Sequence, residues 1–227
     1  MTGKLYGIGV GPGDPELLTL KAVRLMSECD ILALPNKSKE ACVAYEIAKG
    51  AYPELDLKEC LYLEYPMTKD KLILGESRRK NEELVTAKLD EGKVIVFLTL
   101  GDPTIYSTYM YLDKKIREKG YAAEIVSGIP SFCAIGATLG ISLGEAEDEI
   151  HIIPATYGLS ESMELPGTKI LMKAGTKLKE IKAIARNNNY QVAVIENCGM
   201  KEERIMRGID EIPDSSGYYT TAIIKTK

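Results

Sequence analysis

The chain has 227 residues, five cysteines, one histidine and a formal net charge of −4 at pH 7. This near balance of charge argues against a general nucleic-acid binder, which usually carries a basic face. No apolar run has the length of a membrane span and no secretory signal is visible, so we expect a cytoplasmic protein with no membrane partner. The dispersed cysteines predict free thiols, and with a single histidine they predict no metal site.

The first half of the sequence alternates strand patterns with helix patterns. Strands are predicted over residues 5–10, 30–34, 60–64, 93–100 and 122–126, and helices over residues 15–28, 38–49, 76–91, 105–119 and 131–139. This order is typical of a mostly parallel sheet with helices on both faces. The most apolar strand, residues 93–100, is expected at the centre of that sheet.

Strand patterns dominate the second half. They cover residues 150–154, 168–173, 191–196, 203–207 and 218–225, with one clear helix over residues 178–187. The pattern predicts a second α/β domain built on a mixed sheet. We interpret the acidic stretch 145–149 as the connection, so the domains are expected over residues 1–144 and 145–227.

The tripeptide Gly-Asp-Pro occurs twice, as residues 13–15 and 101–103, each time after an apolar strand pattern. Aspartate is a strong N-cap and proline suits the first helical position, so each copy predicts a helix start preceded by free backbone N–H groups. One copy would need no further explanation than helix capping. Two copies at the carboxyl ends of parallel strands, one of them closing a glycine run, favour a cofactor site.

Three nucleotide-binding patterns can be compared with the glycine run of residues 7–13. A P-loop needs a lysine and a hydroxyl residue that are absent here, and the third glycine of a dinucleotide fingerprint is replaced by Pro12 or Asp14. The spacing of Gly7, Gly9 and Gly11 matches ordinary methyltransferases, but the acidic residue expected after the second strand is missing. The spacing leaves S-adenosylmethionine possible without establishing it. The single histidine, His151, lies in a strand pattern without a nucleophile motif, which favours a structural role.

Five segments together resemble the tetrapyrrole methylase family. They are residues 6–22, 100–106, 127–132, 171–175 and 195–200, so the resemblance covers nearly the whole chain. It implies a two-domain α/β fold distinct from that of ordinary methyltransferases, S-adenosylmethionine as the methyl donor, a tetrapyrrole substrate and a homodimer.

Two further stretches, residues 65–70 and 101–112, resemble the family members that methylate C-20 of precorrin-2 or cobalt-factor II in cobalamin biosynthesis. The resemblance therefore implies that reaction. Three alternatives stay open: a sibling methylase acting on another ring carbon, a protein methylase of the diphthine-synthase type, and a nucleotide-binding regulator without activity.

The resemblance also implies which residues contact the cofactor, which is expected in a folded shape between the domains. From the first domain these are Gly9, Gly101, Asp102, Ile105, Pro130 and Ser131. From the second they are Met172, Ala174, Cys198 and Gly199, expected around the adenine. Residues 13–15 are expected to face the substrate.

Asp102 and Tyr106 are the predicted catalytic residues. Asp102 is either a helix N-cap or a group near the methionine portion of the cofactor, and Tyr106 either faces the substrate or belongs to a helix core. No general base is predicted, because the main task in methyl transfer is to hold the reacting atoms in line. Lys69, Lys71, Arg78, Arg79 and Lys80 are either a basic rim for substrate carboxylates or a solvated helix face.

Overall fold

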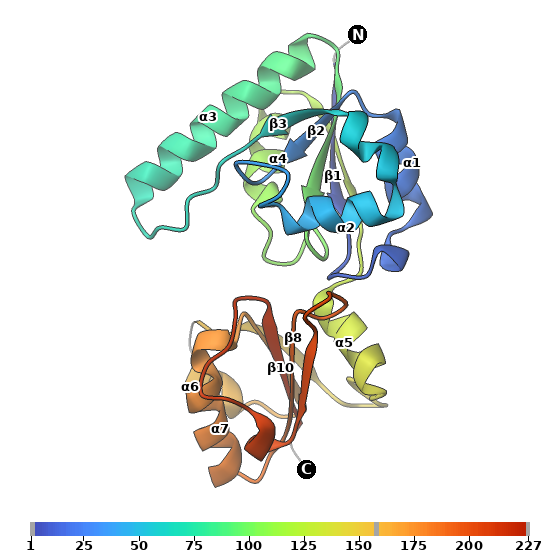
Figure 1. Ribbon diagram of the computed structural model, residues 1–227. Coiled ribbons are helices and arrows are strands. Elements are labelled where there is room, and N and C mark those ends of the chain that lie inside the picture. Colours follow the sequence, from blue (N-terminus) through green and yellow to red (C-terminus); the bar gives the residue numbers. More distant parts are fainter. Residues whose placement is uncertain (1–2, 157–158, 226–227) are drawn as a thin grey trace. The chain divides into compact units, whose positions relative to one another are not determined.

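A computed structural model describes residues 3–156 and 159–225 and divides into two α/β units, Met1–Pro130 and Ser131–Lys227 (Figure 1). The division falls earlier than the expected boundary after residue 144. The helix α5 (Ser131–Leu139) is grouped with the second unit, where the Leu139 carbonyl accepts a hydrogen bond from Arg207 Nη1 at 3.2 Å. The acidic stretch 145–149 therefore lies within the second unit.

The first unit is built on a five-stranded parallel sheet. Its strands are β1 (Lys4–Gly9), β2 (Ile31–Leu34), β3 (Glu59–Tyr62), β4 (Val94–Thr99) and β5 (Ala122–Val126), in the order β3-β2-β4-β1-β5. The prediction that the most apolar strand is central is confirmed, since β4 pairs with both β1 and β2. The strand order places the carboxyl ends of β4, β1 and β5 side by side.

Four helices cover the two faces of this sheet: α1 (Leu20–Glu28), α2 (Val43–Ala51), α3 (Lys71–Asp90) and α4 (Tyr109–Glu118) (Figure 1). Ile95 and Phe97 of β4 pack in one buried cluster with Val85 of α3 and Leu112 of α4. The alternate β4 residue Leu98 is also fully buried, as required of a strand covered on both faces.

The predicted helix ends differ from the observed ones where another side chain caps the helix. The predicted helix over residues 15–28 is divided into a 3-10 turn (Pro15–Leu17) and α1, because Thr19 Oγ1 accepts from Ala22 N at 3.2 Å and starts a new helix. Helix α3 begins five residues earlier than predicted, because the Asp70 carboxylate accepts from Leu72 N at 2.8 Å.

The helix predicted over residues 38–49 is observed as α2, which includes Gly50. A Cβ on Gly50 would be 2.5 Å from the Pro15 side chain, so glycine permits a close contact there.

The second unit has a mixed five-stranded sheet, which confirms the predicted fold class. Its strands are β6 (Ile150–Pro154), β7 (Thr168–Met172), β8 (Gln191–Glu196), β9 (Arg204–Arg207) and β10 (Thr220–Lys225), in the order β6-β7-β10-β8-β9. The short helix α6 (Leu159–Met163) and the longer α7 (Leu178–Asn187) pack on one face, where Ile181 lies against Leu171 and Val194. Helix α6 escaped prediction because five residues are too few to show a helical period.

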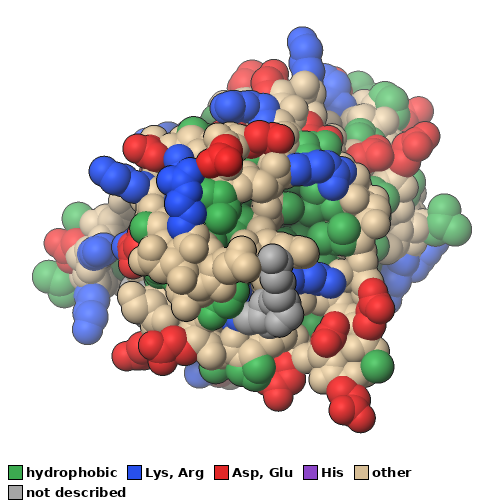
Figure 2. All heavy atoms as spheres, turned by 90° about the horizontal axis from the view of Figure 1, so that it is seen from below, with side chains coloured by type: hydrophobic (Ala, Val, Ile, Leu, Met, Phe, Trp, Pro, Cys, Tyr) green, Lys and Arg blue, Asp and Glu red, His purple; other side chains and the backbone are tan. Residues whose placement is uncertain are grey.

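Charged side chains of both signs are interspersed on the face shown in Figure 2, in keeping with the small net charge. Within the described chain, no helix is both long and apolar enough to cross a membrane.

Glu124 of β5 joins two elements of the first unit through its carboxylate. Its oxygens accept from Lys4 Nζ of β1 at 2.7 Å and from Lys21 Nζ of α1 at 2.6 Å. The Lys21 and Lys4 ammonium groups lower the pKa of Glu124 to about 2. A carboxyl group whose pKa is lowered on folding stabilises the protein above its unfolded pKa, and this contribution is lost as the pH falls toward the folded pKa.

We expect Glu124→Gln to lower the free energy of unfolding by about 0.5–1 kcal/mol at pH 7, since the group is partly exposed and screened by solvent. The difference from wild type should shrink as the pH falls from 5 to 3. Urea unfolding at several pH values measures it, with Glu28→Gln, which removes one exposed ion pair to Arg24, as the control. A pH-independent difference would contradict the assignment.

Candidate functional site

The loops that follow β1 and β4 are hydrogen-bonded to each other. Gly101 N donates to the Gly11 carbonyl at 2.8 Å, and Gly11 N donates to the Gly101 carbonyl at 3.3 Å. Both glycines have positive φ, +77° and +70° for Gly11 and Gly101, a conformation that residues with a side chain adopt only at a cost. The two Gly-Asp-Pro loops therefore lie together, as the sequence predicts.

Three strand ends approach so closely that only glycine fits between them. A Cβ on Gly9 would lie 2.5 Å from the Gly101 carbonyl oxygen and 2.6 Å from Gly128 N. A Cβ on Gly128 would lie 2.3 Å from the same oxygen. Gly9, Gly101 and Gly128, which we call the glycine contact, thus join the ends of β1, β4 and the loop after β5.

Asp102 fixes this contact with its carboxylate. The side chain is 7% exposed, and its Oδ2 accepts from Gly128 N at 3.0 Å. Its Oδ1 accepts from Thr104 N at 2.8 Å and from Thr104 Oγ1 at 2.5 Å. Asp102 therefore closes its own turn and ties that turn to the neighbouring loop.

The expectation that Asp102 is a helix N-cap is wrong. The predicted helix over residues 105–119 starts only at Tyr109, and the residue at its N-cap position is Thr108, which makes no side-chain cap bond. The Asp102 side chain bonds within a turn instead, because the pairing of Gly101 with Gly11 directs the chain across the sheet edge first. The first copy behaves as predicted, since Asp14 Oδ1 accepts from Glu16 N at 2.9 Å and caps the 3-10 turn.

Several backbone N–H groups of these loops have partners within the loops. The N–H groups of Gly11, Gly101, Thr104 and Gly128 all donate to acceptors within the three loops. A phosphate site at a strand end depends on several N–H groups that are available to the anion. These four donors are already used, which leaves fewer N–H groups in the loops for an anion.

Tyr106 lies exposed just after the turn that Asp102 closes. It has φ +49° and is 47% exposed, which excludes the helix-core interpretation. Ile105 precedes it, partly buried, and donates its N–H to the Asp102 carbonyl at 3.2 Å. The buried tyrosine of this region is Tyr109, whose ring packs on the space left by Gly7 and whose hydroxyl donates to Asp113 at 3.0 Å.

Pro130 and Ser131 lie on either side of the division between the units. Both are partly buried, and Ser131 is the first residue of α5. The adjoining Ile129 carbonyl oxygen is 4.0 Å from where a Cβ of Gly101 would lie, so Pro130 follows directly on the loop that meets the glycine contact.

The four predicted cofactor residues of the second unit come from two loops at one edge of its sheet. Met172 ends β7 and Ala174 follows it, while Cys198 and Gly199 follow β8. The start of β10 bonds to both loops, because the Thr220 carbonyl accepts from Ala174 N at 2.8 Å and the Tyr219 carbonyl accepts from Asn197 N at 2.9 Å. Ala174 and Cys198 are buried, and Gly199 is exposed.

Positive φ angles mark the turns at these strand ends. In the second unit Lys173 has φ +57° and Asn197 has φ +54°, and in the first unit Tyr106 has φ +49°. Non-glycine residues pay of order 1–3 kcal/mol for such backbone conformations, which concentrate at ligand sites. These three residues lie in or next to loops that the sequence predicts to bind a ligand, whereas Ala146 and Asn189, which also have positive φ, lie elsewhere.

Glu196 lies in the segment 195–200 that carries part of the resemblance, but its role at this edge was not predicted from the sequence. Its Oε1 accepts from Gly217 N at 2.7 Å and its Oε2 lies 3.4 Å from Arg204 Nη1. The adjacent Ser216 hydroxyl, the Gly217 N–H and Arg204 hold the pKa of this carboxyl below its usual range. Ser216 N in turn donates to the Gly175 carbonyl at 2.9 Å, so Glu196 organises the loop after β7 as well. Its signals in the sequence were its place in that segment and its position at the end of an apolar strand.

Burial raises the pKa of the Cys198 thiol to about 11, so the thiol is neutral at physiological pH. All five cysteines are free. Among the residues that the structure describes, no three His, Cys, Asp or Glu side chains are grouped so as to hold a metal ion.

Solved structures of methyltransferases that act on tetrapyrroles share this fold. The structure is similar to a cobalt precorrin-4 methyltransferase, with a TM-score of 0.75 and 21% identity over 98% of this chain and 94% of that one. It is also similar to a uroporphyrin-III C-methyltransferase from Thermus thermophilus complexed with S-adenosylhomocysteine, with a TM-score of 0.72 and 20% identity over 98% and 97% of the two chains.

Sequence comparison is more specific. The sequence model of the family of tetrapyrrole (corrin/porphyrin) methylases matches residues 4–211 of this chain. A probable cobalt-precorrin-2 C(20)-methyltransferase of Methanocaldococcus jannaschii is 34% identical over 226 residues, 98% of this chain and 96% of the relative. The cobalt-precorrin-2 C(20)-methyltransferase of Salmonella typhimurium is 28% identical over 99% of this chain and 97% of its own. The chain therefore belongs to the tetrapyrrole methylase family.

The glycine contact predicts that Gly128→Ala is strongly destabilising. The new Cβ would clash with the Gly101 carbonyl, so we expect a loss of about 1–3 kcal/mol or failure to fold. Gly75→Ala in α3 is the control, because nothing lies within 4 Å of a Cβ there and alanine should stabilise the helix by about 0.5–1 kcal/mol. Thermal and urea unfolding measure both, and a neutral Gly128→Ala would contradict the close approach.

The two Gly-Asp-Pro copies provide a matched pair of variants. Asp102→Asn removes one acceptor from a buried group that serves three donors, so we expect a loss of about 1–3 kcal/mol in the free energy of unfolding and weaker binding of S-adenosylmethionine. Asp14→Asn should change stability by less than about 0.5 kcal/mol, since asparagine caps equally well. Unfolding and calorimetric titration would test this, and equal effects of the two changes would refute the distinct role of Asp102.

Proposed function

We propose that this protein transfers a methyl group from S-adenosylmethionine to C-20 of precorrin-2 or of its cobalt form in cobalamin biosynthesis. The observation that carries the proposal is similarity over nearly the full length of relatives that are named for the C-20 reaction, together with the family match. Similarity of fold alone would not identify the ring carbon that is methylated, because the similar solved structures are named for other tetrapyrrole substrates.

The reaction is an in-line displacement at the methyl carbon. The bond from sulfur to the methyl group breaks as the bond from C-20 to the methyl group forms, S-adenosylhomocysteine leaves, and C-20 loses a proton. The methyl donor supplies the reactive group, so the protein's contribution is to position the reacting atoms, which can be worth about 7–11 kcal/mol.

The geometry of the first unit fits a donor of this kind. A sulfonium compound carries no phosphate, and the N–H groups of Gly11, Gly101 and Gly128 at the strand ends are used within the loops. We propose that Gly9, Gly101, Ile105 and Pro130 of this unit contact the donor, as does Ser131, the first residue of the second unit. Asp102 holds the loops of Gly101 and Gly128 in place. Tyr106, exposed beside them, is proposed to face the tetrapyrrole.

In the second unit, Met172, Ala174, Cys198 and Gly199 are proposed to contact the adenine. Buried Ala174 and Cys198 offer apolar surface, and the neutral Cys198 thiol adds no charge to it. We also infer a cytoplasmic homodimer, as expected from the family resemblance.

Incubation with labelled S-adenosylmethionine tests the reaction. Precorrin-2, its cobalt form and uroporphyrinogen III are offered separately, and we expect label on one of the first two only, with the new methyl group at C-20 by nuclear magnetic resonance. Label on uroporphyrinogen III alone, or only on a later corrinoid intermediate, would assign a sibling reaction. Binding of the donor without transfer to any ring would favour a regulator.

A further inference from the structure

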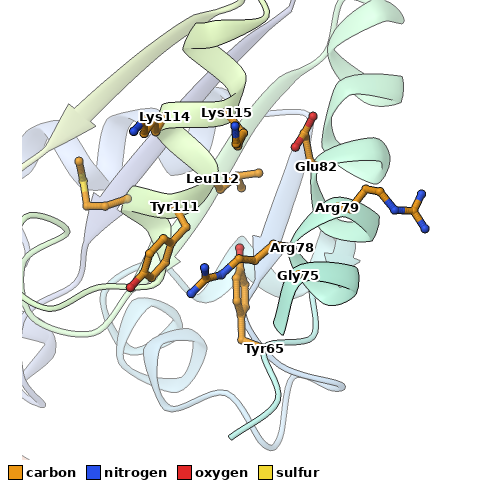
Figure 3. Close-up of a pocket in the computed structure, with 10 residues that line it drawn as sticks. Tyr65, Gly75, Arg78, Arg79, Glu82, Tyr111, Leu112, Lys114 and Lys115 are labelled. Carbon is orange, nitrogen blue, oxygen red and sulfur yellow. The ribbon is translucent and has the colours of Figure 1, made fainter. Parts of the chain in front are cut away.

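A pocket of about 420 Å³ lies between α3 and α4 in the first unit (Figure 3). Its wall from α3 includes Gly75, Arg78 and Arg79, and its wall from α4 includes Tyr111 and Lys115. None of these residues belongs to the loops described above.

Arg78 is the residue best placed to bind a ligand in this pocket. Its Cζ lies 3.7 Å from the centroid of the Tyr111 ring, and Figure 3 shows the guanidinium reaching across the pocket from α3 to that ring. Stacking on an aromatic face leaves the N–H donors of a guanidinium in its plane free to bind an anion.

The neighbouring cations differ from Arg78 in having partners. Arg79 Nη1 lies 2.6 Å from Glu83 Oε1, and Lys115 Nζ lies 2.6 Å from Glu118 Oε2. Among the described residues, no carboxylate oxygen lies within 4 Å of the Arg78 guanidinium. Arg78 is therefore a fixed cation in a concave site that the chain itself does not neutralise.

The remaining charges around the pocket add to this positive character. Lys114 also lines it, with its Nζ 4.0 Å from Glu118 Oε1, and the one carboxylate among the described lining residues, that of Glu82, lies 2.6 Å from Lys119 Nζ. The pocket includes the first turn of α4, which begins three residues after Tyr106. A helix that follows a parallel strand begins at the carboxyl edge of the sheet, so the pocket lies toward the edge that carries the Gly-Asp-Pro loops.

We propose that this pocket binds a carboxylate side chain of a polycarboxylate tetrapyrrole. Arg78, held in place by the Tyr111 ring, donates the hydrogen bonds to that carboxylate. The inference rests on the proposed function for the identity of the substrate. A guanidinium binds a carboxylate through two parallel N–H···O bonds, and a large ring with peripheral acid groups can occupy this pocket while its reacting carbon lies elsewhere.

The test is equilibrium binding of a stable porphyrin to the intact protein, which needs no methyl transfer. Uroporphyrin III, an octacarboxylate, is titrated by fluorescence, and coproporphyrin III, a tetracarboxylate, serves as the less charged probe. We expect Arg78→Ala to weaken uroporphyrin binding about tenfold, Arg78→Lys to recover part of that loss, and added salt to reduce the difference.

Arg79→Ala is the matched control, because Arg79 is the next residue of the same helix and is paired with Glu83, and its guanidinium extends away from Arg78 and Tyr111 in Figure 3. It should change the dissociation constant less than twofold. Circular dichroism of each variant shows whether its helix content is that of the wild type. If Arg78→Ala loses helix content, Arg78→Gln is used in its place.

Equal binding by wild type and Arg78→Ala, an equal loss in Arg79→Ala, or no binding of uroporphyrin by the wild type would each overturn the inference. Inorganic phosphate that displaces uroporphyrin at equal concentration would identify a general anion site and overturn it as well. The proposed function fails separately, when Arg78-dependent binding is present but no tetrapyrrole is methylated.

Discussion

The contact of three strand ends at Gly9, Gly101 and Gly128 is the constraint on which the first unit's site depends. Backbone atoms approach there within distances that no Cβ permits. The Asp102 carboxylate holds the contact by accepting from Gly128 N, and a buried carboxylate is stable in such a place only because its oxygens are hydrogen-bonded. The loops after β1, β4 and β5 are thereby fixed relative to one another before any ligand binds.

This constraint determines what the loops can offer a ligand. Strand-end N–H groups bind phosphate in other α/β sheets, but those of Gly11, Gly101 and Gly128 are used here to bind one loop to another. What remains for recognition is the shape of the loops and the side chains that they project, such as Tyr106. A site of this kind is suited to positioning the reacting atoms of a methyl donor and a ring.

The second unit uses the same device with a different carboxylate. Glu196 ends β8 and accepts from Gly217 N at 2.7 Å, as Asp102 follows β4 and accepts from Gly128 N at 3.0 Å. In both units an acidic side chain at a strand end accepts a hydrogen bond from the backbone N–H of a glycine in a neighbouring loop. The two sheet edges therefore share this way of joining loops.

The sequence by itself determined the parallel and mixed sheets, the central position of β4 and the juxtaposition of the Gly-Asp-Pro loops, because apolar periodicity and glycine spacing are local signals. The family resemblance supplied the reaction. Only the tertiary structure decided that Asp102 binds Gly128 rather than capping α4, that Glu196 organises its own edge, and that Arg78 stacks on Tyr111. Each of these contacts joins residues that the chain keeps eight or more positions apart, so no local pattern encodes it.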